Sequence, residues 1–338
     1  MTHAMRMRLG SLLLATVSAV AFTASATTAN ADALRDKWCK DVHLRFFVGG
    51  AEGDAFGTIV YNGAKQAAND TGAQVDYVFS SWTSEKMVQQ LREAVASKPD
   101  GIAMMGHPGD DAIMPLADQA AAAGIKMMYQ NVPVDKVTAK DGGGYVGAQQ
   151  AAQGHALGVE AVKLAGAKSG DTAIMIGPFD NVNRGARELG TVAAMKEAGL
   201  NVVQITSPQD GSWASDPNLA IPTITAALVA HPETKIVGYP GGQMLGNVQA
   251  YMQAAGKKPG DIFNFGFDTS PQIVEAFKGG WVQLTADQQP FLQGYLPILS
   301  LCAQVVYGLS PINVDTGAGF VTKDNYEIVA KLAAEQLR

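Results

Sequence analysis

The residues that most often carry catalysis or bind metals are scattered along this chain. The five histidines lack the spacing of a metal site, and no H-E-x-x-H, C-x-x-C or G-x-S-x-G motif occurs. There is no G-x-x-x-x-G-K-[ST] phosphate loop, and no G-x-G-x-x-G motif follows a predicted strand. We therefore expect a protein that is not an enzyme and that holds no cofactor and no metal.

Two smaller features could add polar groups to a site. His107 follows a predicted strand, where it could face a cleft or serve only its own loop. Asp110 and Asp111 could imitate a carboxylate site, but their position just before Ile113 favours a helix start, where acidic residues interact well with the helix dipole. Neither feature defines a reaction.

The first 31 residues have the pattern of a secretory signal peptide. Arg6 and Arg8 precede an uncharged apolar run over 9–26, and small residues follow at Ala29 and Ala31. We expect cleavage after Ala31; an uncleaved membrane anchor is the alternative. The mature chain is therefore predicted to work in the periplasm.

Composition narrows the range of partners. Without residues 1–31 the chain has 23 Lys and Arg against 31 Asp and Glu, a net charge of −8. Such an acidic protein is a poor candidate for binding nucleic acid or anionic lipid. The only cysteines, Cys39 and Cys302, could form a disulfide in an oxidising compartment or remain buried thiols.

Short apolar runs alternate with helical patterns through the mature chain. The predicted strands cover 44–49, 74–79, 101–105, 126–130, 172–177, 201–206, 235–239, 262–267 and 282–285. The predicted helices cover 55–71, 84–96, 113–123, 185–198, 218–230, 246–255, 271–278, 291–307 and 325–337. This βαβ pattern in two blocks predicts an α/β protein with two doubly wound parallel-sheet lobes, whose strand-end loops would surround a common cleft.

Several short motifs stand in the order found in one family. They are Asp54-Ala55-Phe56, Asp100-Gly101-Ile102, Arg187-Glu188-Leu189-Gly190, Gly266-Phe267-Asp268 and Gln288-Gln289-Pro290. On these motifs the chain resembles, over residues 44–320, the type I periplasmic sugar-binding proteins of ABC importers, typified by ribose- and galactose-binding proteins.

The resemblance implies two Rossmann-like lobes joined by three hinge crossovers, near 147–150, 286–289 and 313–319. The N-terminal lobe would comprise 32–148 and 289–313, and the C-terminal lobe 149–288 and 314–338. This division puts Cys39 and Cys302 in the same lobe, where a disulfide is possible.

The resemblance also implies a set of ligand-binding positions. They are Asp54, Phe56, Asn131, Arg187, Trp213, Gly241, Asp268 and Gln288. Carboxylate, guanidinium and amide groups suit sugar hydroxyls, and Phe56 and Trp213 could sandwich a ring. The structural alternatives are helix capping by Asp54 or Asp268, packing of the aromatic residues, a surface place for Arg187 and a plain hinge role for Gln288.

Departures from the family pattern leave the ligand open. Asn131-Val132 replaces the usual Asp-Arg pair, Gly57 replaces a second aromatic residue, and 240–243 reads Pro-Gly-Gly-Gln. These changes argue against ordinary ribose or glucose recognition and leave room for a bulkier or differently shaped ligand. Residues that could replace the lost contacts are Glu52, Trp82, Gln130 and Gln243.

The expected function is capture of a small neutral sugar, sugar alcohol or cyclitol in the cleft, followed by delivery to an ABC permease. The alternative is a signal receptor of the same fold, with a furanosyl autoinducer or a chemoreceptor as partner. The resemblance further implies a monomer.

Overall fold

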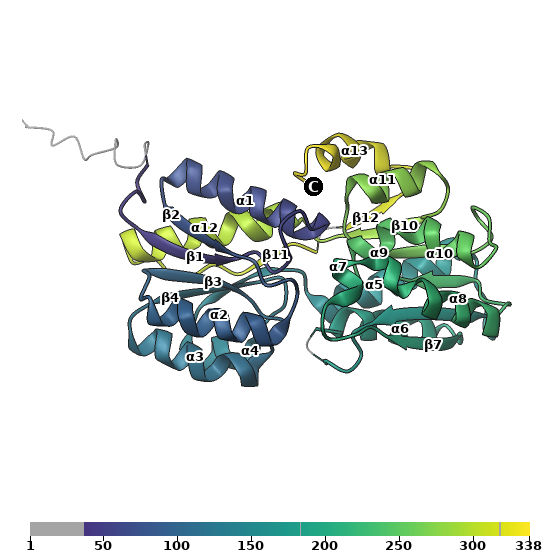
Figure 1. Ribbon diagram of the computed structural model, residues 1–338, viewed down its shortest axis with the longest axis horizontal. Helices are drawn as coiled ribbons and strands as arrows, with labels where there is room; N and C mark the ends of the chain where they lie inside the picture. The colour runs from purple at the N-terminus through teal and green to yellow at the C-terminus, as the bar shows by residue number, and fades with distance from the viewer. Residues whose placement is uncertain (1–36, 183, 318) are drawn as a thin grey trace, which may run out of the picture.

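The computed structural model describes residues 37–182, 184–317 and 319–338. The expected signal peptide over 1–31 lies outside the described residues. Two α/β lobes stand side by side, each built on a six-stranded sheet (Figure 1). Among the described helices, none has the length and apolar character that crossing a membrane requires. The two-lobed α/β fold expected from the alternating pattern is confirmed.

The N-terminal lobe has the strand order β11-β5-β4-β3-β1-β2, with every pair parallel. Its strands are β1 (His43–Phe47), β2 (Gln74–Val78), β3 (Gly101–Met105), β4 (Lys126–Gln130), β5 (Gly144–Gly147) and β11 (Val314–Asp315). Its helices are α1 (Ala55–Thr71), α2 (Ser84–Ala96), α3 (Asp110–Ala122), α4 (Asp135–Asp141) and α12 (Pro290–Tyr307).

The C-terminal lobe has the order β12-β10-β9-β8-β6-β7, parallel except for the β10–β12 pair. Its strands are β6 (Thr172–Gly177), β7 (Asn201–Thr206), β8 (Ile236–Gly238), β9 (Phe263–Phe267), β10 (Leu284–Asp287) and β12 (Gly319–Thr322). Its helical elements are α5 (Gln150–Ala165), α6 (Ala186–Glu197), α7 (Ser212–Ser215), η2 (Pro217–Ala220), α8 (Ile221–Ala230), α9 (Gly242–Gly246), α10 (Val248–Ala254), α11 (Pro271–Lys278) and α13 (Tyr326–Ala334).

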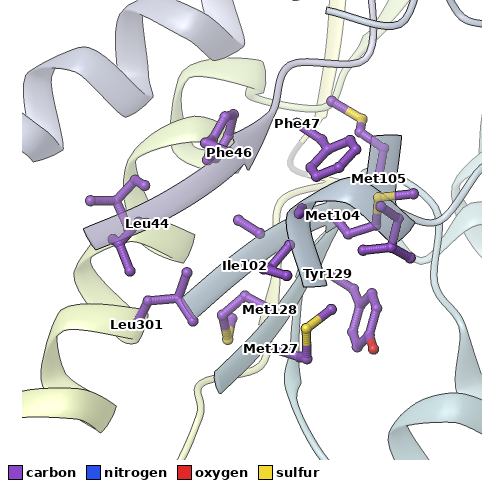
Figure 2. Close-up of a cluster of buried hydrophobic side chains, with 14 of the residues drawn as sticks. Leu44, Phe46, Phe47, Ile102, Met104, Met105, Met127, Met128, Tyr129 and Leu301 are labelled. Carbon is purple, nitrogen blue, oxygen red and sulfur yellow. The ribbon is translucent and has the colours of Figure 1, made fainter. Parts of the chain in front are cut away.

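The cores explain why the strands lack polar alternation. In the N-terminal lobe, β1, β3 and β4 place apolar side chains on both sheet faces, and Leu301 of α12 packs beside Leu44 and Ile102 (Figure 2). A parallel sheet covered by helices on both sides buries both faces, so its strands are apolar throughout. The same holds for β6, which is buried along its whole length.

Two helix pairs meet backbone to backbone at glycines. On α1 and α12, an added Cβ at Gly294 would lie 1.9 Å from the Val60 oxygen. On α5 and α6, an added Cβ at Gly154 would lie 1.8 Å from the Arg187 oxygen. Glycine is therefore required at these contacts because any side chain would push the helices apart.

The structure links Cys39 to Cys302 on α12 by a disulfide, with both residues fully buried. The bond fixes the segment before β1 to the helix that returns from the other lobe. This segment also contacts α12 through Trp38, whose ring stacks on Tyr307 with the centroids 5.1 Å apart.

The element boundaries differ from the expected ones in several places. Val314 and Asp315 pair with β5, so the N-terminal lobe continues to residue 315 rather than ending at 313. The helix expected over 246–255 is α10 (Val248–Ala254), and a separate short helix, α9 (Gly242–Gly246), precedes it. The elements α4, β5, α5, α7, α9, β11 and β12 were not expected.

Candidate functional site

A cavity of about 50 Å³ lies between the lobes, at the carboxyl ends of the strands. We call it the inner pocket. Its lining comes from both lobes and consists of Phe56, Trp82, His107, Asn131, Arg184, Arg187, Ala214, Gly241, Gln243, Asp268 and Gln288. Pockets at the carboxyl ends of parallel strands are the usual ligand sites of doubly wound folds.

Asp268 is the central acceptor of the pocket. It follows β9 with a left-handed φ of 79°, which turns its buried carboxylate toward the cleft. One oxygen accepts the Gly242 backbone N–H at 2.8 Å, and the other accepts from the Gln288 amide. Burial raises the pKa of Asp268, although the charge of Arg187 and these hydrogen bonds oppose the shift.

Arg187, on the first turn of α6, is held from three sides. Its Nε donates to Glu188 Oε1 at 2.9 Å, and Nη2 donates to the Pro240 carbonyl. The guanidinium lies 4.3 Å from the centroid of the Phe267 ring, a cation–π contact. Because the side chain is only 4% exposed, these partners fix it in place before any ligand arrives.

Arg184 and His107 extend the polar lining. Arg184 Nη1 donates to Glu188 Oε1 at 3.4 Å, and burial and the like charge of Arg187 lower the pKa of Arg184. Burial, together with the two arginines, lowers the pKa of His107 well below its usual value, so its imidazole is neutral. His107 Nδ1 has no hydrogen-bond partner among the residues described.

Asn131 and Gln288 connect the N-terminal lobe to the second crossover. Asn131 follows β4 with a φ of 66°, a conformation that asparagine tolerates better than most residues. Its Nδ2 donates to Gln288 Oε1 at 3.3 Å and to Gln293 Oε1 at 3.1 Å. Gln288 therefore bridges Asn131 of one lobe and Asp268 of the other.

Aromatic side chains form the wall on the N-terminal lobe. Phe56 lies 5.8 Å from Trp82 between ring centroids, and Trp82 lies 5.2 Å from His107. Trp213, expected opposite Phe56, does not line the inner pocket; it lies on α7 at a neighbouring cavity. The second aromatic ring of the inner pocket is therefore Trp82, which lies beside Phe56 on the same lobe and not opposite it.

Asp54 has two structural partners in its own lobe and one across the cleft. It caps α1 by accepting from the Gly57 N–H at 2.6 Å, and it accepts from Trp82 Nε1 at 2.9 Å. Gln243 of the C-terminal lobe donates to the same carboxylate. Burial raises the pKa of Asp54. Asp54 therefore both caps α1 and forms a contact between the two lobes.

Further contacts show the lobes meeting over the site. Asn181 Nδ2 donates to the His107 carbonyl at 3.5 Å, and Thr83 Oγ1 donates to the Asp210 carbonyl at 3.5 Å. Together with the Asp54–Gln243 contact, these hydrogen bonds join loops of opposite lobes. The structure is therefore a closed arrangement of the two lobes.

The structure gathers most of the expected positions at the inner pocket and separates the others. Those that line it are Phe56, Trp82, Asn131, Arg187, Gly241, Gln243, Asp268 and Gln288. Glu52 and Asp54 line a groove beside it. Gln130 is buried inside its lobe, where it donates to the Phe47 carbonyl at 3.0 Å. Arg184 was missed because it lies in a loop without a recognisable motif.

Comparison with known proteins identifies the family. The profile described as "periplasmic binding protein domain" matches residues 46–308, most of the chain. The chain belongs to this family. The resemblance stated from the sequence motifs is thereby confirmed.

Named relatives of this periplasmic binding protein bind sugars. It is 27% identical over 257 residues to the xylose/arabinose-binding protein XylF of Sulfolobus acidocaldarius, covering 71% of this chain and 61% of the relative. It is 26% identical over 235 residues to the D-allose-binding periplasmic protein of Escherichia coli, covering 68% of this chain and 73% of the relative.

Solved structures show the same fold. A carbohydrate transporter of Acidothermus cellulolyticus in complex with myo-inositol superposes with a TM-score of 0.74 at 24% identity, covering 88% of this chain and 99% of that one. A solute-binding protein of Burkholderia graminis in complex with D-arabinose gives a TM-score of 0.75 at 23% identity, covering 85% of this chain and 97% of that one.

Proposed function

We propose that this protein captures a small neutral sugar or polyol in the inner pocket and delivers it to an ABC permease. The observation that carries the proposal is the lining of the pocket. Acceptors and donors from both lobes, such as Asp268, Arg187 and Asn131, meet there beside the aromatic wall of Phe56 and Trp82. Hydroxyl edges of a sugar suit the polar groups, and its C–H faces suit the rings.

The charge balance of the pocket favours a neutral ligand. Arg184 and Arg187 face the carboxylates of Glu188 and Asp268, so the two cations already have anionic neighbours. A ligand with a net charge would add a buried charge without an oppositely charged partner, and such a charge weakens binding. The sugars named for the relatives and the polyols bound by the structural neighbours are of this neutral class.

Transport follows from closure of the lobes about the three crossovers. A ligand that touches both lobes only in the closed form shifts the population toward that form. The permease then recognises the closed shape, and no bond in the ligand is made or broken. We place this cycle in the periplasm and assign the monomer as the active species.

Thermal unfolding of the purified protein tests the proposal. Neutral pentoses, hexoses, sugar alcohols, cyclitols, sugar acids and furanosyl signal compounds are screened, because a ligand that binds only the folded state raises the melting temperature. A concentration-dependent rise with one neutral sugar or polyol is expected. A rise only with acids or signal compounds would overturn the assignment.

Small-angle X-ray scattering tests the closure step separately. A saturating ligand should reduce the radius of gyration of the protein. The Gln243→Ala variant lacks the hydrogen bond to Asp54 across the cleft, so without ligand it should be more open than the wild type. Equal compactness of the wild type with and without a tight ligand would contradict closure.

A further inference from the structure

A second cavity adjoins the inner pocket and is larger. It measures about 100 Å³ and we call it the outer cavity. The residues that line both cavities are Trp82, His107, Arg184, Ala214, Gly241 and Gln243. Because these six residues are common to both linings, the two cavities form one inter-lobe space with a narrow inner part and a wider outer part.

The outer cavity has an indole on each side of the cleft. Trp82 comes from the N-terminal lobe, and Trp213 comes from α7 of the C-terminal lobe. Indole rings bury the apolar C–H face of a sugar ring and need no fixed hydrogen-bond geometry to do so. Trp213 packs partly against the core of the C-terminal lobe, and it lines the outer cavity but not the inner pocket.

The polar groups of the outer cavity suit hydroxyls and not an anion. Its lining offers hydroxyl and amide groups from Ser84, Asn181, Ser207 and Gln209, together with His107. His107 is 4% exposed, its imidazole is neutral, and its Nδ1 has no partner within the described part of the chain. The cation of the lining, Arg184, already contacts Glu188, so an anion would compete with an existing ion pair.

Gly241 leaves the passage between the two cavities open. Its φ of 177° is extended backbone that any residue adopts, so conformation does not demand glycine there. An added Cβ would lie 3.5 Å from Asp268 Oδ2 and 3.7 Å from Arg187 Nη2, so a longer side chain would project beside the two main polar groups of the pocket. At Gly241, glycine therefore leaves space between the two cavities and is not required by the backbone conformation.

We infer that the preferred ligand is a neutral disaccharide, with one ring in the inner pocket and the second between Trp82 and Trp213 in the outer cavity. This inference rests on the proposed sugar-binding function and specifies its substrate class. The inner pocket, at about 50 Å³, is the smaller of the two, so a second ring would have to lie in the adjoining outer cavity of about 100 Å³.

Isothermal titration calorimetry on the purified protein tests the inference. The probes are glucose, galactose and xylose, compared with cellobiose, maltose, melibiose and xylobiose. We expect one disaccharide to bind about tenfold or more tightly than either of its component sugars, the scale of one well-packed aromatic contact. Equal or tighter binding of a monosaccharide would overturn the inference but leave the proposed function intact. If neither these saccharides nor any neutral sugar or polyol of the thermal screen binds, the proposed function itself fails.

Substitutions at two positions, Trp213 and Ser207, localise the second ring. Trp213→Ala should weaken disaccharide binding about tenfold or more and change monosaccharide binding by less than about threefold, whereas Trp213→Phe should restore most of the loss. Ser207→Phe, which fills the outer cavity from a different element, should give the same selective loss. Trp38→Ala is the matched control, because Trp38 stacks on Tyr307 in the N-terminal lobe. Equal loss for both ligand sizes with Trp213→Ala and with Ser207→Phe would overturn the inference.

Discussion

Replacing Asp268 by asparagine keeps the size of the side chain and removes its charge. In the native protein each carboxylate oxygen accepts one hydrogen bond, from the Gly242 N–H at 2.8 Å and from the Gln288 amide. Asparagine has one oxygen, so its NH2 group must face one of these two donors. The Asp268→Asn variant therefore loses one internal hydrogen bond, and the ligand loses a charged acceptor.

The size of the effect follows from the charge on the acceptor. A hydrogen bond to a charged group contributes about 1.5–3 kcal/mol. Since each 1.4 kcal/mol is a factor of ten in affinity, the loss of one such bond to the ligand weakens binding by about 10- to 150-fold. The fold should survive, because Arg187 keeps its bonds to Glu188 and Pro240.

Titration calorimetry with the sugar found in the thermal screen measures this loss. The matched control is Asp111→Asn, because the Asp111 side chain is 95% exposed and its ion pair among the described residues is with Lys136 at the surface. The control should bind with the wild-type dissociation constant. A dissociation constant for Asp268→Asn within about threefold of the wild type would refute the assignment of Asp268 as a ligand contact.

Three other perturbations follow from contacts in the structure. Replacing Cys39 and Cys302 together by alanine should lower the free energy of unfolding by about 2–4 kcal/mol, because the bond closes a loop of 263 residues; urea unfolding measures this. Gly154→Ala should cost about 1–3 kcal/mol in the same assay and also weaken ligand binding, since the added Cβ collides with the backbone of Arg187. Burial raises the pKa of Asp268 in the folded state above 3.8, its value in the unfolded state. As the pH falls, Asp268 is therefore protonated in the folded protein before it is protonated in the unfolded chain, and the ionised Asp268 carboxylate destabilises the fold. The melting temperature of the wild type minus that of Asp268→Asn should therefore rise as the pH falls through the raised pKa toward 3.8.

Each of these has a control or a contradicting result. Equal urea midpoints for the oxidised wild type and the double alanine variant would show that the disulfide contributes no stability. Gly319→Ala is the control for Gly154→Ala, because an added Cβ at Gly319 meets no atom within 4 Å. A melting-temperature difference that falls with falling pH would contradict the raised pKa of Asp268.

The bounds of helices and strands could be predicted from the sequence where a large apolar side chain occurs in each helical turn or strand. The bounds of α1, α2, β3, β4, β6, β7 and α11 agree with the expected ranges. The helix α5 was missed because its buried face carries Gly154 and Gly158, where the backbone of α6 approaches. A helix whose contact face consists of glycines shows no hydrophobic periodicity in the sequence.

The site was predictable where a residue follows a strand end. Asn131 and Asp268 stand directly after β4 and β9, and their positive φ angles could not be anticipated but do not change their place. The place of Arg184 in the site, and the fact that Trp82 lines the inner pocket whereas Trp213 does not, depend on how two loops from different lobes meet. That relation involves residues far apart in the sequence, so no local pattern encodes it.

The packing of α12 against α1 also sets an order of events for the newly made chain. The sheet strands β6 to β10 come from one continuous stretch, so the second lobe has most of its sheet as soon as residue 287 is available. The first lobe waits for α12, which covers α1 and supplies Cys302, and for β11. The first lobe is therefore completed only after most of the sheet of the second lobe has been made.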